Sequence, residues 1–129
     1  MSENNRVKVV IANFRAAVMT LEKFMALPIT NDRDRAGIIQ AFEFCYELAW
    51  NTIKKIAEEK GLEAPTPLEA FQVGFQIGLI KPEEQQTWLE MKKTRNLTTH
   101  TYREKLAQEV LVKIRDFYLQ AFQSLSMRL

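Results

Sequence analysis

Three side chains suited to phosphate chemistry lie within eight residues of one another: Arg95, His100 and Tyr102. An arginine guanidinium carries a permanent positive charge in a planar fork that matches a phosphate group. His100 is the only histidine in the 129 residues, and an imidazole accepts or donates a proton near neutral pH. A tyrosine phenol can donate a hydrogen bond, accept one or be modified. The segment therefore predicts a site that binds or transforms a phosphate group.

Positive charge surrounds this segment. Residues 91–105 hold five basic side chains against the single acid Glu104: Lys92, Lys93, Arg95, Arg103 and Lys105. A run of charge is usually a solvated helix surface, but this run encloses the only histidine. We therefore count Lys92, Lys93 and Arg103 as candidate phosphate-binding residues. The whole chain has a formal net charge of only +2, which argues against a broad nucleic-acid-binding surface.

Apolar residues recur at helical spacing along almost the whole chain, and no stretch of comparable length alternates as a strand does. We expect a first helix that carries an apolar stripe over residues 7–25 and ends before Pro28. Asn31 or Asp32 is the predicted cap of a second helix, which ends at Gly61.

The second half of the chain predicts further helices. Residues 66–69 (Thr-Pro-Leu-Glu) form a capping box for a short helix that closes near Gly78. Pro82 opens a fourth helix, and a last, long helix carries an apolar stripe over residues 106–125. Connections this short favour antiparallel neighbours. The sequence therefore predicts an all-α fold, an antiparallel up-and-down helical bundle of four to five helices, in one domain over residues 1–129.

The phosphate-type residues flank a predicted break between the last two helices. Residues 101–104 (Thr-Tyr-Arg-Glu) form a second capping box, in which Thr101 is the predicted N-cap, so that His100 directly precedes the last helix and Tyr102 opens it. Three weak helix formers favour a break before it: Asn96, Thr98 and Thr99. Residues five apart on an unbroken helix would diverge by about 140°. A bend instead lets Arg95 and His100 converge on one ligand near a helix N-terminus, which attracts anions.

Composition restricts the site and the location. The single cysteine, Cys45, excludes a disulfide within the chain, and no Cys/His set of the kind that binds zinc is present. We therefore expect no metal and no cofactor. The first residues are polar and acidic, and no apolar run has the length of a signal peptide or a membrane span. These features predict a cytoplasmic protein with no membrane partner.

The segment RNLTTHTY (residues 95–102) resembles the Arg-x4-His-x-Tyr signature of the HEPN superfamily, in the form found in HepT toxins. The wider chain is similar to the nucleotidyltransferase substrate-binding proteins, the stand-alone partners of minimal (MNT) nucleotidyltransferases. No motif position departs from the pattern. Three segments carry the wider likeness: RAGIIQAFEFCYELAW (35–50), FQVGFQIGLI (71–80) and WLEMKKTRNLTTHTY (88–102).

The resemblance implies a fold, an activity and partners. It implies a homodimer of antiparallel helical bundles that acts as a metal-independent RNase, with RNA or a nucleotide as ligand and a cognate MNT nucleotidyltransferase as partner. Arg95 and His100 would be the active-site residues, and Asn96 the polar residue that follows the arginine. Tyr102 would be the residue that the partner adenylylates to silence the toxin.

One histidine per chain constrains such a reaction. Cleavage of RNA through its 2′-hydroxyl requires a base for that proton, an acid for the leaving 5′-oxygen, and positive charge where the phosphorane develops. If histidine does both proton transfers, two copies must meet across one cleft, as in a symmetric dimer. Arg95 would then stabilise the charge of the transition state. An AMP group on Tyr102 would give Arg95 and His100 an anion and block the cleft.

Two other functions stay open. The chain could be a non-catalytic subunit that holds a substrate or nucleotide for a separate nucleotidyltransferase, with Arg95 and His100 binding a phosphate without cleaving it. It could also be a structural helical module, in which the motif only fixes a helix junction and Arg95 pairs with a carboxylate.

The second helix carries two further pairs of interest. Phe44 and Leu48 lie off the main apolar stripe, which predicts either burial on several sides or a subunit interface. Glu43 and Glu47 lie one helical turn apart. Without a second histidine-containing motif they do not indicate a pair of metal ligands, and we expect them to be solvated surface carboxylates.

Overall fold

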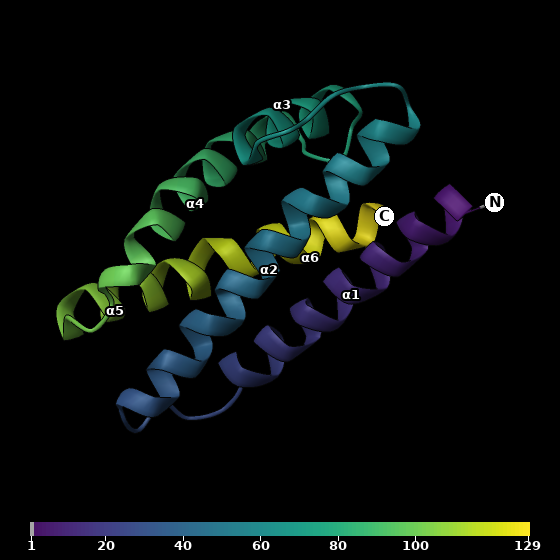
Figure 1. Ribbon diagram of the computed structural model, residues 1–129. Coiled ribbons are helices and arrows are strands. Elements are labelled where there is room, and N and C mark those ends of the chain that lie inside the picture. The colour runs from purple at the N-terminus through teal and green to yellow at the C-terminus, as the bar shows by residue number, and fades with distance from the viewer. Residues whose placement is uncertain (1) are drawn as a thin grey trace.

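All regular secondary structure of the chain is helical, as a computed structural model shows for residues 2–129, with side chains described from Asn5 onward (Figure 1). No strand occurs within this range. The elements are α1 (Ser2–Met25), α2 (Asp32–Glu59), α3 (Pro67–Gln76), the 3-10 turn η1 (Pro82–Glu84), α4 (Gln85–Leu97), the 3-10 turn η2 (Thr98–His100), α5 (Glu104–Lys113), the π-helical turn η3 (Ile114–Tyr118) and α6 (Leu119–Arg128). Because α5, η3 and α6 follow one another without a break, they form one long last helix.

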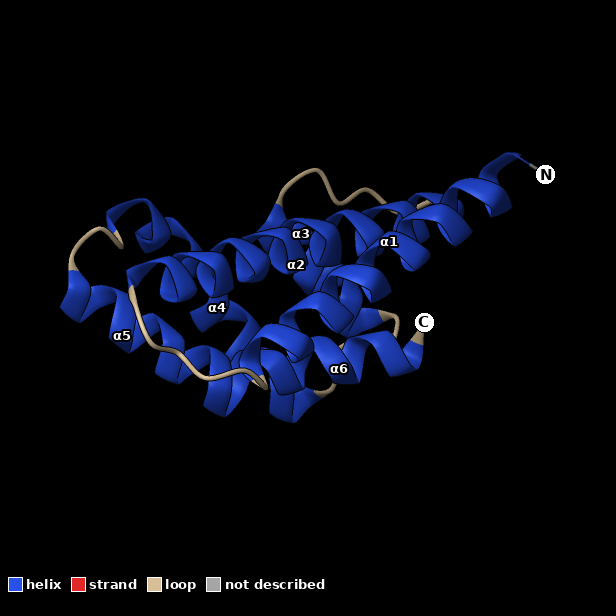
Figure 2. Cartoon of the chain, turned by 90° about the horizontal axis from the view of Figure 1, so that it is seen from below, coloured by secondary structure: helices blue, strands red, loops and turns tan. Residues whose placement is uncertain are grey.

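The helices run up and down in an antiparallel bundle, as the sequence predicted. α1 and α2 lie side by side and are joined by a short loop, and α3 and α4 fold back along α2 (Figure 1). The last helix then returns so that both ends of the chain lie at the same end of the molecule. Seen from below, it runs along one side of the bundle (Figure 2). The η2 turn and the start of α2 lie together at the opposite end.

Several helices begin and end at the capping residues that the sequence predicted. The Asn31 side chain accepts a hydrogen bond from the Asp34 amide at 2.8 Å and so caps α2. Gly61 follows α2 and Gly78 follows α3 with φ angles of +76° and +84°. Side chains with a Cβ rarely adopt these angles, so glycine ends both helices at little steric cost.

The core is centred on Phe122 of α6. Its ring centroid lies 6.2 Å from that of Phe14 in α1, 6.0 Å from that of Phe42 in α2 and 5.7 Å from that of Trp88 in α4. Phe42 in turn stacks on Tyr118 at 5.5 Å. These rings are buried, so one aromatic cluster holds four of the five helices together.

The last helix differs from its prediction at η3, which is π-helical rather than α-helical. Ile114 and Tyr118 of this turn are buried in the core, whereas Phe117 is 57% exposed, although the apolar stripe predicts that Phe117 is buried. The Tyr118 hydroxyl lies 2.6 Å from the buried Thr94 hydroxyl of α4. Burial raises the pKa of the Tyr118 phenol, which therefore stays protonated at neutral pH. This hydrogen bond fixes α4 at the residue directly before Arg95.

No helix in the described range is long and apolar enough to cross a lipid bilayer.

Two phenylalanines of the last helix test the role of the aromatic cluster. Replacing Phe122 with alanine leaves a cavity among four helices, and we expect the free energy of unfolding to fall by about 3–5 kcal/mol. Phe117→Ala removes the same side chain from an exposed position and should change the free energy of unfolding by less than about 0.5 kcal/mol. Urea denaturation followed by circular dichroism measures both. Equal losses in the two variants would contradict the assigned packing.

Candidate active site

Arg95, near the end of α4, is bound to α2 by two carboxylates. Its Nη1 atom lies 3.1 Å from Glu43 Oε2, and its Nε atom lies 3.5 Å from Glu47 Oε1. All three side chains are half-buried. The other oxygen of Glu47 accepts a hydrogen bond from the indole of Trp50 at 3.0 Å. The guanidinium is therefore held at a fixed place on the face of α2.

Thr98, the first residue of η2, completes this network. Its side chain hydroxyl accepts a hydrogen bond from Arg95 Nη1 at 2.9 Å and donates one to Glu43 Oε2 at 2.6 Å. The carbonyl oxygen of Arg95, 2.8 Å away, is the alternative acceptor for the same proton. Thr98 is only 5% exposed. Sequence reasoning missed this role, because it treated Thr98 only as a weak helix former.

The network leaves part of the Arg95 guanidinium free. The Nε atom is buried and, although close to Glu47, makes no hydrogen bond. Within the described part of the chain, Nη2 makes no hydrogen bond. A phosphate oxygen could therefore bind at Nη2 while Glu43 and Thr98 keep the guanidinium in place.

The role predicted for the two glutamates is wrong. Glu43 and Glu47 are not merely solvated surface carboxylates, because both pair with Arg95. The prediction failed because their partner lies far away in the sequence. Their spacing of one helical turn does place them on the same face of α2, which is the signal that sequence alone offered.

The bend between α4 and α5 exists, but Thr101 does not cap the last helix as predicted. Its hydroxyl donates to the carbonyl of Thr98 at 2.8 Å and so stabilises η2. Arg103 occupies the N-cap position without a side-chain hydrogen bond, and α5 begins at Glu104. His100 therefore ends η2 instead of directly preceding a helix, and Tyr102 lies in the turn between η2 and α5.

His100 and Tyr102 lie on the exposed side of this bend. Their ring centroids are 6.2 Å apart in an edge-to-face arrangement, and the guanidinium carbon of Arg103 lies 5.8 Å from the centre of the Tyr102 ring. Tyr102 is 77% exposed. In the described structure, no hydrogen bond or ion pair joins His100 to Arg95. The bend thus carries an arginine that is paired with α2 and, a few residues later, an exposed histidine and tyrosine.

The remaining predicted residues line the surface around the bend. Lys93, Asn96 and Arg103 are exposed, and Lys92 is half-buried. Neither lysine forms an ion pair with a carboxylate among the described residues. Their charges are therefore available to an anionic ligand.

Exposed apolar side chains flank the Arg95 network. Phe44, adjacent to Glu43 in α2, is 56% exposed, and Leu97, at the end of α4, is 43% exposed. Leu48 is half-buried against the core. Of the two alternatives for this pair, burial within the bundle therefore describes Leu48 but not Phe44.

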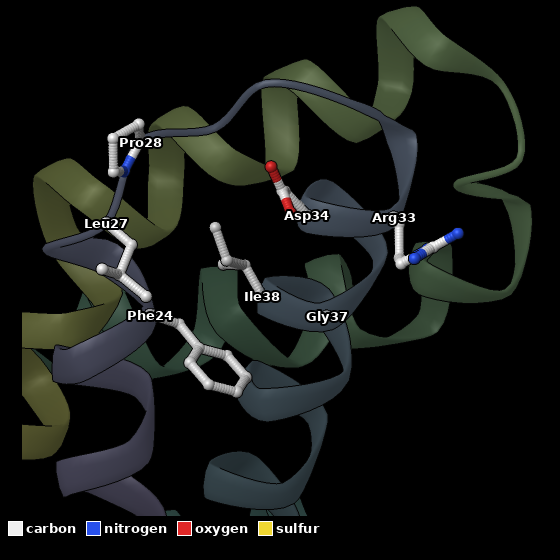
Figure 3. A pocket seen from close by; sticks show the side chains of 7 residues that line it. All are labelled: Phe24, Leu27, Pro28, Arg33, Asp34, Gly37 and Ile38. Carbon is white, nitrogen blue, oxygen red and sulfur yellow. The ribbon is translucent and has the colours of Figure 1, made fainter.

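A hollow elsewhere on the molecule has different chemistry. It lies at the turn between α1 and α2, where Phe24, Leu27 and Ile38 point toward one another while Arg33 extends away from them (Figure 3). The hollow is mainly apolar, and neither His100 nor Arg95 lines it. Among the described residues, no three His, Cys, Asp or Glu side chains gather in a way that could hold a metal ion.

Comparisons with known proteins found a matching family model, a similar protein and a similar solved structure. Residues 10–129 match the sequence model of a family described as "Nucleotidyltransferase substrate binding protein like". The chain is 29% identical over 98 residues to the probable ribonuclease HepT of Haemophilus influenzae, a match that covers 72% of this chain and 66% of that protein's length. It also resembles the crystal structure of a Thermus thermophilus protein, with a TM-score of 0.81 and 29% identity over 89% of this chain and 97% of the other.

Two adjacent threonines test whether Thr98 organises the site. Thr98→Val keeps the shape but leaves the polar groups of Glu43 and Arg95 without their shared partner. We expect the free energy of unfolding to fall by about 1–3 kcal/mol. Thr99→Val makes the same change at an exposed neighbour and should stay within about 0.5 kcal/mol of the wild type. Urea denaturation of both variants measures the difference, and a Thr98→Val variant as stable as Thr99→Val would refute the network.

Proposed function

Because the chain belongs to the family of nucleotidyltransferase substrate-binding-like proteins, we propose that it is a HepT-like toxin, a metal-independent endoribonuclease whose partner is an MNT-type nucleotidyltransferase. The observation that carries this proposal is the arrangement at the α4–α5 bend. A guanidinium fixed by Glu43 and Thr98 keeps Nη2 free, and the only histidine of the chain lies exposed five residues later. The similarity to a protein named probable ribonuclease HepT supports it.

The proposed reaction needs only groups that the chain and the RNA supply. One imidazole takes the proton of a ribose 2′-hydroxyl, and the 2′-oxygen attacks the adjacent phosphorus. The bond from phosphorus to the 5′-oxygen breaks, and a second, protonated imidazole gives that oxygen its proton. The products are a 2′,3′-cyclic phosphate and a free 5′-hydroxyl. Arg95 stabilises the negative charge of the phosphorane through Nη2.

The two imidazoles come from two chains, because each chain has one histidine. The exposed Phe44 and Leu97 beside Arg95 provide an apolar surface on which a second copy can pack. A two-fold axis near this surface would bring two His100 side chains to one RNA strand. Lys93 and Arg103 would then bind the flanking phosphates.

Adenylylation of Tyr102 is the proposed means of silencing. The chain has three tyrosines, and Tyr46 and Tyr118 are buried whereas Tyr102 is 77% exposed. Only Tyr102 can therefore reach the active site of another enzyme without unfolding. An AMP group there would place bulk and negative charge next to His100.

A non-catalytic subunit remains the second candidate function. The two carboxylates around Arg95 outnumber its single positive charge and weaken its attraction for a phosphate. In that case the bend would hold a substrate for the partner enzyme without cleaving RNA.

RNase assays separate the two candidates. We expect the purified chain to cut single-stranded RNA in the presence of EDTA and to leave 2′-O-methylated RNA intact, because the methyl group removes the nucleophile. His100→Ala and Arg95→Ala should each lower the rate by about 100-fold or more, since each removes a group required in the transition state. Arg6→Ala is the matched control, because Arg6 is an exposed arginine near the N-terminus, at the other end of the bundle. Uncut RNA, or equal rates in all variants, would favour the non-catalytic function.

Mass spectrometry tests the silencing mechanism. After incubation with the partner nucleotidyltransferase and ATP, the intact mass of the chain should increase by AMP, and RNase activity should fall in parallel. Tyr102→Phe removes the accepting oxygen and should show neither change, whereas Tyr118→Phe should be modified as the wild type is. AMP on the Tyr102→Phe variant would show that the acceptor lies elsewhere.

A further inference from the structure

A hollow of about 290 Å³ lies beside Tyr102, between the first turns of α2 and the start of α5, and no residue of the Arg95 network lines it. Three apolar residues line it, Ala36 and Ile39 of α2 and Ala107 of α5. Tyr102 belongs to its wall. The volume is close to the lower end of the range of about 300–1,000 Å³ found for small-molecule sites.

Polar groups also line the hollow. Arg35, which is half-buried, contacts Asp32 on its own helix and lies 3.8 Å from Glu104 of α5. The Thr101 side chain also lines the hollow. The first turn of α5 adds backbone amides, because its N-cap residue Arg103 makes no side-chain hydrogen bond to them. The lining of the hollow therefore combines apolar side chains, two carboxylates and one guanidinium, and the uncapped start of α5 lies beside it.

We propose that this hollow receives the adenosine of an AMP group attached to Tyr102, an inference that rests on the proposed silencing of the toxin by adenylylation. In that step the phenolic oxygen of Tyr102 attacks the α-phosphorus of ATP, the bond from the α-phosphorus to the bridging oxygen breaks, and pyrophosphate leaves. The phenolic proton goes to a base of the nucleotidyltransferase or to solvent. The product is a phosphodiester between Tyr102 and adenosine.

Each part of the nucleotide has a complementary group in the hollow. The adenine ring fits against Ala36, Ile39 and Ala107, which removes its faces from water. The ribose hydroxyls can donate hydrogen bonds to the carboxylates of Asp32 or Glu104. The phosphodiester carries one negative charge, which Arg35 can stabilise by exchanging its long contact with Glu104 for one with the phosphate, while the amides at the start of α5 add hydrogen-bond donors.

This placement gives adenylylation a second effect besides blocking the cleft. The nucleotide would join the α4–α5 bend to the start of α2, two segments that the pair of Arg35 and Glu104 already connects. The modified chain would then be more stable than the unmodified chain. Its phosphodiester would also be shielded from enzymes that hydrolyse such bonds.

The test compares wild type, Ala36→Leu and Arg35→Gln after full adenylylation by the partner enzyme. Ala36 is exposed and lines the hollow, so a leucine there fills the space without disturbing the core. Ala12→Leu, at an exposed alanine of α1, is the matched control. A soluble phosphodiesterase is added, and the loss of AMP is followed by intact mass. The midpoint of thermal unfolding is measured before and after modification.

We expect slow loss of AMP from wild type and Ala12→Leu. Loss from Ala36→Leu and Arg35→Gln should be at least about tenfold faster, because a factor of ten corresponds to about 1.4 kcal/mol of docking free energy. We also expect adenylylation to raise the unfolding temperature of wild type but not of Ala36→Leu. Equal rates in all four chains would overturn the docking of adenosine and leave the silencing of the toxin intact. A wild-type chain that takes up no AMP at all would overturn both.

Discussion

The rest of the site depends on the pairing of Arg95 with Glu43 and with the hydroxyl of Thr98. This interaction joins the end of α4 to the middle of α2. The buried hydrogen bond between the hydroxyls of Thr94 and Tyr118 joins the same turn of α4 to the last helix. An arginine that had to be ordered on each encounter would lose side-chain entropy when it bound a phosphate. Because Arg95 is held by Glu43 and Thr98, its side chain has already lost that freedom. Glu43 also partly compensates its charge as long as no phosphate is bound.

The motif is divided by the bend into a fixed part and an accessible part. Arg95 and Thr98 are bound to the bundle, while His100 and Tyr102 project from it. An accessible imidazole that makes no hydrogen bond within the described structure is suited to meet a second copy, and an accessible phenol is suited to meet a modifying enzyme. The same exposure thus serves both the proposed activity and its proposed control.

Most of the fold followed from local sequence. Apolar spacing predicted the helices, and Asn31, Gly61 and Gly78 act at helix ends as their chemistry requires. The errors have physical causes. Thr101 occupies the position that the capping-box pattern assigns to an N-cap, but its hydroxyl donates instead to the nearby carbonyl of Thr98. The sequence pattern predicted that Glu43 and Glu47 are solvated surface carboxylates, but α4 places Arg95 next to both. Helical periodicity did not reveal the π-helical turn, where Phe117 is exposed although it belongs to the apolar stripe.

The central claim is that each chain fixes its own arginine while two chains share the proton transfers. Wild-type and His100→Ala chains can be mixed, allowed to exchange subunits, and assayed for RNA cleavage at constant total chain concentration. If both histidines of a pair are needed, an equal mixture retains about one quarter of the wild-type activity, because about one quarter of randomly formed dimers carry two. An activity near one half would mean that each chain works alone and would contradict the claim.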